Sequence, residues 1–303
     1  MQLIKPDINI DFVGKRKIAI AISIVLILIG FASLVVKGGP NYGIDFAGGT
    51  LVQVQFAEPT DATAIKKAMQ GIELGSVVVQ RFGDNQNEFL IRVEQSTTEL
   101  QGLSVQIQNA LEQTYAKGDV DIRRVEMVGP QVGKDLRSKG LKAIFYAMIG
   151  LLAYISWRFE FRFAVGAIVA LVHDVAITLG AFSLFNKEID LPIIAAFLAI
   201  IGYSLNDTII VYDRIRENSG KYNKEGFSYI VNRSINETLS RTLLTSGTTL
   251  LVVLALFILG GGVIHNFAFA MLVGVVVGTY SSIFVASPVL IFWQQKKKKR
   301  PAK

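Results

Sequence analysis

Six long apolar stretches limit what this sequence of 303 residues can fold into. Each is close to the roughly 20 apolar residues that a helix needs to cross a bilayer, and all are too long for core strands. The composition agrees, because only 18% of the residues are charged, whereas soluble domains carry about 25%. We therefore expect an α-helical membrane protein with six transmembrane helices, at residues 18–36, 141–157, 163–185, 191–212, 243–259 and 264–293.

The first stretch has the position of a secretion signal but not its pattern. Its apolar part exceeds the roughly 7–15 residues of a signal, and no pair of small residues marks a cleavage site after it. Val35, Val36 and Lys37 follow instead. We expect it to remain as a transmembrane helix.

Lysine and arginine gather at alternate ends of the six stretches. They cluster before the first stretch, in the second and fourth connections, and after the last stretch, where Lys296–Arg300 is entirely basic. Because cytoplasmic loops carry the excess of basic residues, we expect residues 1–17, the loop 213–240 and the tail 294–303 to be cytoplasmic. A basic run beside a span is interpreted as an anchor to the inner leaflet of the lipid bilayer, and no nucleic-acid partner is expected.

One connection, residues 37–139, is long enough to fold as a domain outside the membrane. Alternating apolar residues predict strands, and helical spacing of apolar residues predicts helices. The predicted strands are 50–56, 76–82, 88–94 and 119–128, and the predicted helices are 60–71 and 97–117. This β-α-β-β-α-β order is the split ferredoxin-like pattern.

The chemistry available to this domain is limited. The sequence has no cysteine, and the domain shows neither a nucleophile–base pair nor a cluster of metal-ligand residues. We expect a scaffold or a binding surface, with no covalent catalysis, no cofactor and no metal site.

Three ionisable residues fall inside the predicted spans. Asp174 lies 12 residues after Arg162, about 18 Å along a helix, and Asp207 lies about 24 Å from the start of its span. Arg241 precedes the fifth apolar run, on a helix that we expect to begin near Ser234–Glu237, which matches a capping box. A charge at the membrane centre costs roughly 2.5–3.5 kcal/mol, so a partner or a water-filled cleft is needed. We expect Asp207 and Arg241 to form an ion pair that opens when the acid is protonated.

Small polar residues accompany these charges at helical spacing, and hydroxyl groups between two acids and an arginine suit a proton relay. The predicted polar lining consists of Ser204, Asn206, Thr208, Thr245, Ser246, Thr248 and Thr249. Structural roles remain open: Asp207 as an interhelical hydrogen-bond partner, Asp174 as a cap of a neighbouring helix, Arg241 as an interfacial anchor, and the hydroxyl groups as packing contacts.

A glycine-rich segment follows the first span. It contains Gly38, Gly39 and Pro40, and then the motif residues Gly43, Asp45, Gly48 and Gly49. The segment is interpreted as either a hinge or a tight turn between the first span and the outer domain.

Four motifs together resemble the SecF family. They are Gly43–Thr50, His173–Val175, Gly202–Thr208 running into Asp213–Asn218, and Arg241–Thr249. The resemblance covers essentially the whole chain. It implies one six-helix half of a 12-span transporter of the resistance-nodulation-division superfamily, with the outer domain in the periplasm and the helices in the bacterial plasma (inner) membrane.

The resemblance also implies partners and an activity. The second half would be SecD, the complex would act with the SecYEG channel, and YajC would be an accessory partner. The family uses the proton-motive force to pull preproteins across the membrane. Its functional residues correspond to Asp207 and Arg241, with Asp174 in the polar interior, and the coupling ion would be H⁺ or Na⁺.

Parts of the sequence also suggest other classes of function. An intramembrane aspartyl protease would use two membrane acids, but the Gly-x-Gly-Asp motif of that class is absent. A small-molecule exporter half and a passive assembly scaffold remain alternatives to a proton-driven role in protein export.

Overall fold

The computed structural model describes residues 8–70, 77–82, 86–93, 100–116, 118–260 and 262–298. Within these residues, six helical segments are long and apolar enough to cross a membrane. They are α1 (Arg16–Val36), α5 (Pro130–Arg158), α6 (Phe161–Leu184), α7 (Leu191–Lys221), α8 (Phe227–Leu259) and the segment Ile264–Gln295. The predicted membrane fold is therefore confirmed.

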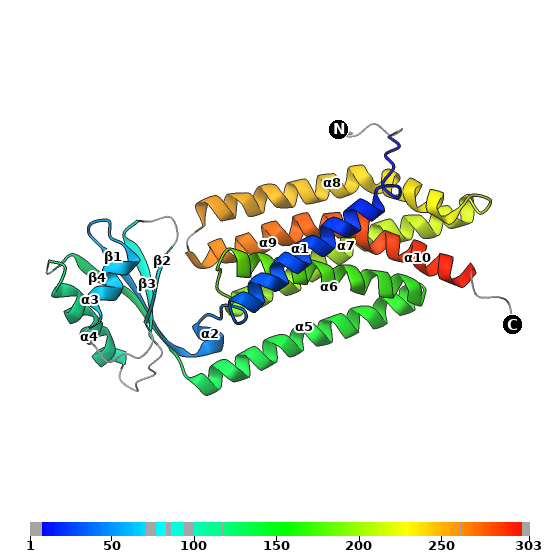
Figure 1. Ribbon diagram of the computed structural model, residues 1–303. Coiled ribbons are helices and arrows are strands. Elements are labelled where there is room, and N and C mark those ends of the chain that lie inside the picture. The colour runs from blue at the N-terminus through cyan, green and yellow to red at the C-terminus, as the bar shows by residue number, and fades with distance from the viewer. Residues whose placement is uncertain are drawn as a thin grey trace.

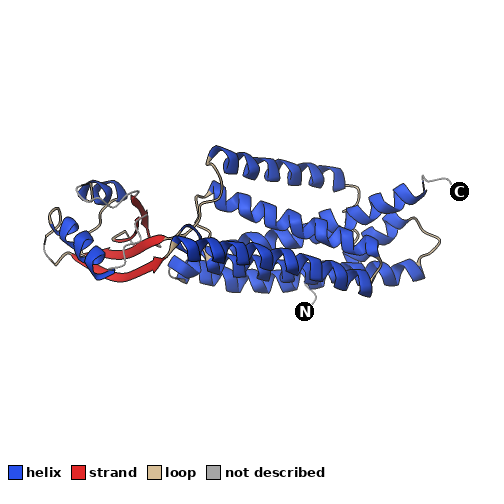
Figure 2. Ribbon diagram, turned by 90° about the horizontal axis from the view of Figure 1, so that it is seen from below, coloured by secondary structure: helices blue, strands red, loops and turns tan. Residues whose placement is uncertain are grey.

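The helices form an elongated bundle with a small sheet domain beyond one end (Figures 1 and 2). We call the end beside the sheet the domain end. The opposite end, where both the first and the last described residues lie, is the tail end. Helix α6 is the most enclosed, with 61% of its most apolar window buried, whereas the corresponding shares are 11% for α5 and 17% for α8. The outer faces of α5 and α8 are thus free to contact lipid or another protein.

Three helices extend beyond their apolar runs. Helix α5 begins at Pro130, although the sequence assigned residues up to 139 to the outer domain, and most of the predicted loop 213–240 belongs to α7 and α8. The predicted start of the fifth helix near Ser234 is wrong, because α8 begins after Gly226 and the Ser234 hydroxyl donates to the Ile230 carbonyl of the same helix. Apolar runs mark only the part of a helix that lies in hydrocarbon.

The sixth span is interrupted near its middle. It consists of α9 (Gly262–Ser281), a π-helical turn η1 (Ser282–Ala286) and α10 (Ser287–Lys298). Pro288 has no N–H to continue the α-helical ladder, and its ring would clash with a carbonyl one turn earlier. The wider turn accommodates it, and the Ser287 hydroxyl donates to the Ser282 carbonyl at 2.9 Å.

The outer domain is a four-stranded antiparallel sheet with strand order β2-β3-β1-β4. The strands are β1 (Gly49–Phe56), β2 (Val77–Arg81), β3 (Glu88–Val93) and β4 (Val120–Val128). Helices α3 (Ala62–Ala68) and α4 (Leu100–Glu112) pack on alternate residues of β1 and β3, such as Val52, Val54 and Ile91. The order confirms the ferredoxin-like prediction. The predicted turn at 83–85 and residues 94, 97–99 and 117 lie outside the described part of the chain.

The N-terminal segment is held against α8 by two asparagines. The Asn232 and Asn236 side chains accept from the backbone N–H groups of Phe12 and Ile10 at 2.9 and 2.8 Å. Both asparagines also donate to the Ile10 carbonyl. We call this contact the asparagine clamp.

Candidate functional site

Asp174 is buried in α6 and is surrounded by hydrogen-bond donors. One carboxylate oxygen lies 2.8 Å from His173 Nδ1. The other accepts from the hydroxyl groups of Ser204 on α7 at 2.5 Å and Ser281 on α9 at 2.8 Å. Donors from two neighbouring helices offset the cost of removing a carboxylate from water. Asp174 therefore joins three helices.

A second group of contacts extends from Asp174 to the first span. His173 Nε2 lies 3.0 Å from the Ser23 hydroxyl of α1, which is 3.1 Å from the Tyr280 hydroxyl of α9. Tyr280 in turn donates to the Ala19 carbonyl at 2.6 Å. Ser23, Tyr280 and Ser281 were not predicted as site residues, although a serine inside an apolar run is itself a signal that a partner is near.

Asp207 on α7 is fully buried but has few partners. Its Oδ2 accepts from the Ser246 hydroxyl of α8 at 3.3 Å, and Ser246 lies 2.7 Å from the Thr279 hydroxyl of α9. Its Oδ1 has no hydrogen-bond partner among the described residues, and neither has the buried hydroxyl of Thr242. An isolated carboxylate in this position is far from the fully bonded state that buried charges need.

The hydroxyl groups that bind Asp174 on α6 lie on α7 and α9, one turn or less from Asp207 and from the contacts of Asp207 on these helices. Ser204, which binds Asp174, precedes Asp207 by one turn of α7. Thr279 and Ser281 present the corresponding hydroxyl groups from α9. A Cβ added to Gly278 would lie 2.9 Å from Ser204 Cβ, so α9 and α7 are in close contact here. Any change at Asp207 acts next to the hydrogen bonds of Asp174.

Arg241 does not form the expected ion pair. Its side chain is exposed and lines a cavity of about 520 Å³ between α5, α7 and α8, together with the acids Asp213, Glu217 and Glu237. The charge of Arg241 still acts on Asp207 at longer range. The rotation of α8 explains the difference, because Thr242 and Ser246 are turned inward and Arg241 is not.

The predicted polar lining divides into residues that reach an acid and residues that do not. Ser204 and Ser246 each donate to a carboxylate, and Thr208 is buried. The hydroxyl groups of Thr245, Thr248 and Thr249 bond to carbonyls of their own helix. Asn206 is exposed on the outer face of α7. The continuous hydroxyl path that the sequence suggested is therefore not present among these residues.

The glycine-rich motif forms the junction between the bundle and the sheet. Asp45 lies in the short helix α2 (Ile44–Ala47), and its Oδ2 accepts from the Leu191 N–H at the start of α7 at 2.9 Å. Gly43 N–H donates to the Ile189 carbonyl at 2.9 Å. Phe46 is buried in an apolar cluster with Ile193 and Phe197 of α7. The motif is thus fixed to the beginning of the helix that carries Asp207.

Gly48 and Gly49 make the turn into the sheet possible. Both have positive φ, 79° and 110°, which favours glycine. A Cβ on Gly48 would lie 2.9 Å from Pro130 Cα, at the start of α5. Gly49 pairs with Val128, so the chain enters and leaves the sheet at one place. Gly48 and Gly49 thus form the turn that joins α2 to β1.

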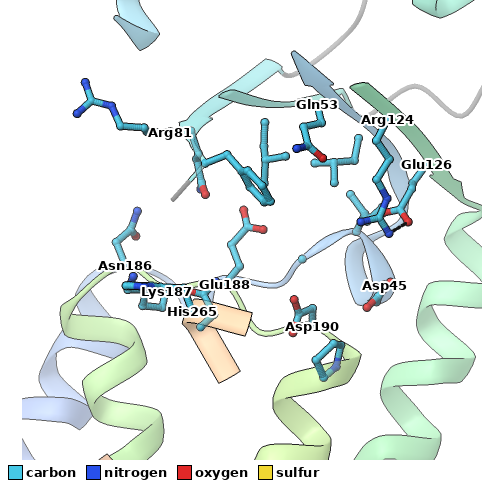
Figure 3. Close-up of a pocket in the computed structure, with 18 of the residues that line it drawn as sticks. Asp45, Gln53, Arg81, Arg124, Glu126, Asn186, Lys187, Glu188, Asp190 and His265 are labelled. Atoms are coloured by element: carbon cyan, nitrogen blue, oxygen red, sulfur yellow. Dashed lines mark hydrogen bonds and ion pairs between the residues drawn. The ribbon is translucent and has the colours of Figure 1, made fainter. Parts of the chain in front are cut away.

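Acidic groups line the space between the sheet and the helix ends. Figure 3 shows Asp45, Glu188 and Asp190 below the strands that carry Gln53 and Arg124, around a cavity of about 450 Å³. Burial, and secondarily the nearby charges of Asp45 and Glu188, raise the pKa of Asp190 to about 6. Burial also raises the pKa of Glu188, although Arg92 on β3 forms an ion pair with it.

Comparison with known proteins identifies the family. A family model described as "Protein export membrane protein SecD/SecF, C-terminal" matches residues 106–296, and one described as "SecD/SecF GG Motif" matches residues 32–60. The protein translocase subunit SecF of Magnetococcus marinus is 49% identical, covering all of this chain and 97% of that protein. The chain belongs to the SecF family. The SecF subunit of Vibrio alginolyticus is 45% identical over 96% of this chain and 91% of that protein.

Solved SecDF structures show the same fold. SecDF from Thermus thermophilus, described as a translocon-associated membrane protein, superposes with a TM-score of 0.87 at 36% identity, over 97% of this chain. SecDF in a super-membrane-facing form superposes with a TM-score of 0.72 at 37% identity, over 98% of this chain. This SecF-family chain spans 40% of the length of each SecDF chain. Members of this family are named as subunits of a protein translocase, which does not favour the alternative of an intramembrane aspartyl protease.

Proposed function

We propose that this chain is the SecF half of a SecDF translocase of the resistance-nodulation-division type, and that it couples the proton-motive force to the late stages of preprotein translocation. Protonation of Asp207 would change its interaction with the charge of Arg241 and with Ser246. The helices would then shift against the second half, and the outer domain would move with them.

The observation that carries this proposal is the state of Asp207. Its carboxylate is fully buried in a transmembrane helix, yet among the described residues it has a single hydroxyl contact at 3.3 Å and one unpartnered oxygen. Asp174, by contrast, is bonded from three sides. Asp207 can gain or lose a proton without disrupting a hydrogen-bond network, whereas Asp174 cannot, so Asp207 suits a coupling site and Asp174 suits a structural one.

The energy available is sufficient for such a change. One elementary charge that crosses 100 mV releases about 2.3 kcal/mol, which shifts a two-state equilibrium roughly 50-fold. The two solved SecDF forms fit this chain with TM-scores of 0.87 and 0.72 at nearly equal identity and coverage. Two conformations of SecDF are what a mechanism based on movement of the helices and the outer domain requires.

A second six-helix half fits the open side of the bundle. Asn206 is exposed on α7, between α5 and α8, whose own apolar windows are only 11% and 17% buried. A polar amide facing lipid lacks hydrogen-bond partners, so this face favours a protein neighbour. We assign it to SecD, with SecYEG, the preprotein and YajC as further partners of the complex.

The charge distribution supports one orientation. Among the described residues, the basic clusters lie at the tail end, so the tail end would face the cytoplasm and the sheet domain the periplasm, in the bacterial plasma (inner) membrane. The coupling ion is proposed to be H⁺, because the single hydroxyl that contacts Asp207 within the described part of the chain is a poor oxygen shell for a bare cation.

Ion-gradient-dependent export tests the proposal. Vesicles would carry SecYEG, SecD and this chain with Asp207→Asn, Arg241→Met or, as a control, Glu225→Gln, an exposed acid in the loop between α7 and α8. We expect both site variants to assemble with SecD but to lose the stimulation of export by a proton gradient. The control should keep it, and a Na⁺ gradient alone should not replace the proton gradient.

The alternatives give other results. If both site variants keep full stimulation while deletion of the outer domain removes it, the chain is a passive scaffold. Transport of a small amphipathic substrate that depends on Asp207, without any effect on export, would identify an exporter half.

A further inference from the structure

The sheet domain touches the start of α7 at two places. Asp45, three residues before Gly48 in the turn into β1, accepts from the Leu191 N–H. Arg92 on β3 forms an ion pair with Glu188 and donates to the Tyr42 carbonyl. Glu188 lies in the loop between α6 and α7, three residues before Leu191. The sheet is therefore held to the start of α7 and to the loop that leads into it.

That helix is the one that carries Asp207. Helix α7 runs without interruption from Leu191 to Lys221, and Asp207 lies about 24 Å from Leu191 along it. A continuous helix transmits a displacement along its length because its backbone hydrogen bonds hold it rigid. Movement at Asp207 would therefore reach Leu191.

The other connection is a covalent turn. The chain enters β1 through Gly48 and Gly49 and leaves β4 through Gly129 into Pro130, and these two points are in contact. A single point of attachment allows the sheet to rotate about it. The orientation of the sheet relative to the helices then depends on the contacts away from this point, namely Asp45 with Leu191 and Arg92 with Glu188.

We propose that Asp45 is a positioning residue that makes the sheet domain follow α7. The negative carboxylate binds the N-terminus of α7, where backbone N–H groups and the helix dipole favour an anion. Phe46, the next residue, is buried against Ile193 and Phe197, so α2 moves with α7. Arg92 and Glu188 hold β3, the strand next to β1, to the loop before α7. This inference rests on the proposed function and adds the route by which movement leaves the membrane.

Distance measurements between two labels test it. Because the sequence has no cysteine, spin labels can be placed through Glu58→Cys after β1 and Leu259→Cys at the end of α8, both exposed. The full chain would be assembled with a cysteine-free SecD in lipid vesicles. We expect Asp45→Ala to broaden the distance distribution, and Asp45→Asn, which keeps an oxygen acceptor, to restore the native width. Asp121→Ala, which removes an exposed acid of β4, should change nothing.

A second variant removes the donor and leaves Asp45 intact. Leu191→Pro deletes the N–H that Asp45 binds, at a first helical position where proline is tolerated. The preceding residue, Asp190, already has the extended backbone that a following proline requires (φ −118°, ψ −176°). Leu191→Pro should broaden the distribution of distances between the two spin labels, as Asp45→Ala does. Native widths in both variants would overturn the inference.

The same labels separate this inference from the proposed function. With Asp45 present, Asp207→Asn should shift the mean distance, and Asp45→Ala should abolish most of that shift. If Asp207→Asn causes no shift, the proposed coupling at Asp207 fails, while the widths still decide the role of Asp45. If the shift persists in full without Asp45, the covalent turn at Gly48–Pro130 transmits the motion and the inference is wrong.

Discussion

At the scale of single residues, the two membrane acids differ in how completely their charge is compensated. Asp174 has three hydrogen-bond neighbours from three helices, whereas Asp207 has one distant hydroxyl contact among the described residues. Asp174 thus connects neighbouring helices through hydrogen bonds, whereas Asp207 is a candidate site for the coupling ion. Two predictions follow from individual side chains.

Removing a donor from Asp174 should weaken the bundle. Ser204→Ala leaves one carboxylate oxygen with Ser281 alone, and we expect a loss of about 1 kcal/mol in unfolding free energy. Denaturant titration in detergent measures it. Thr248→Ala, whose hydroxyl bonds only to its own helix, is the matched control and should stay near the native value. Equal losses in both variants would contradict the structural role of Ser204.

Asp190 predicts a pH dependence of stability. Its folded pKa is raised to about 6 from 3.8, so the folded state binds the proton more tightly than the unfolded state. The resulting stabilisation is full below about pH 4 and is lost as the pH rises through about 6, with a size of up to about 3 kcal/mol.

The comparison with Asp190→Asn isolates this contribution. Asparagine keeps an acceptor for the Ile193 N–H at the helix cap but does not titrate. The difference in melting temperature between the native chain and this variant should change between pH 5 and pH 7.5, with the native chain gaining at the lower pH. A constant difference would show that Asp190 titrates normally.

At the scale of elements, the close contact between α1 and α6 depends on two glycines. A Cβ on Gly30 would lie 2.7 Å from Gly180 Cα, a distance that real structures do not tolerate. This contact also sets the distance over which Ser23 meets His173. Small residues at such crossings let membrane helices approach closely.

Gly30→Ala should therefore push α1 away from α6. We expect a loss of about 1–3 kcal/mol in unfolding free energy, as for other overpacked contacts. Gly150→Ala on α5 is the control, because its Cβ would have no atom within 4 Å and alanine is a better helix former. A native-like Gly30→Ala protein would mean that the two helices are not packed as described.

Sequence patterns predicted the elements well where the pattern lies within one segment. Apolar runs located the six spans, and alternation located the strands of the sheet. The contacts between segments could not be predicted in this way: Ser23 and His173 are 150 residues apart. The rotation of α8 was also beyond reach, since Arg241 and Ser246 share one polar stripe in sequence but face different surroundings. The helix α2 is four residues long and gives no periodic signal.

At the scale of the whole molecule, one side of the bundle is unfinished. Asn206 lies exposed on α7, and α5 and α8 on either side have largely exposed apolar windows. For a chain in lipid alone, an apolar residue would be better than asparagine at this position. In a chain that packs against a partner protein, the Asn206 amide can form hydrogen bonds with that partner.

Asn206→Leu should therefore have opposite effects on the isolated chain and on the complex. We expect the isolated chain to become more stable in detergent, because a polar group leaves the apolar phase. Co-purification with SecD should decrease. Val172→Leu, an exposed position on α6, controls for added bulk and should affect neither measurement. Unchanged assembly of the Asn206 variant would place SecD on another face.

The asparagine clamp has a consequence for the order in which the molecule is made. Its two halves, Ile10–Phe12 and Asn232–Asn236, are more than 200 residues apart in the chain. Synthesis proceeds from the N-terminus, so the first described residues must wait, without their partner, until five spans have begun to emerge from the ribosome. Closing the clamp is then a late event that requires the start of α8, and a nascent chain halted before residue 232 would leave that segment open to proteases.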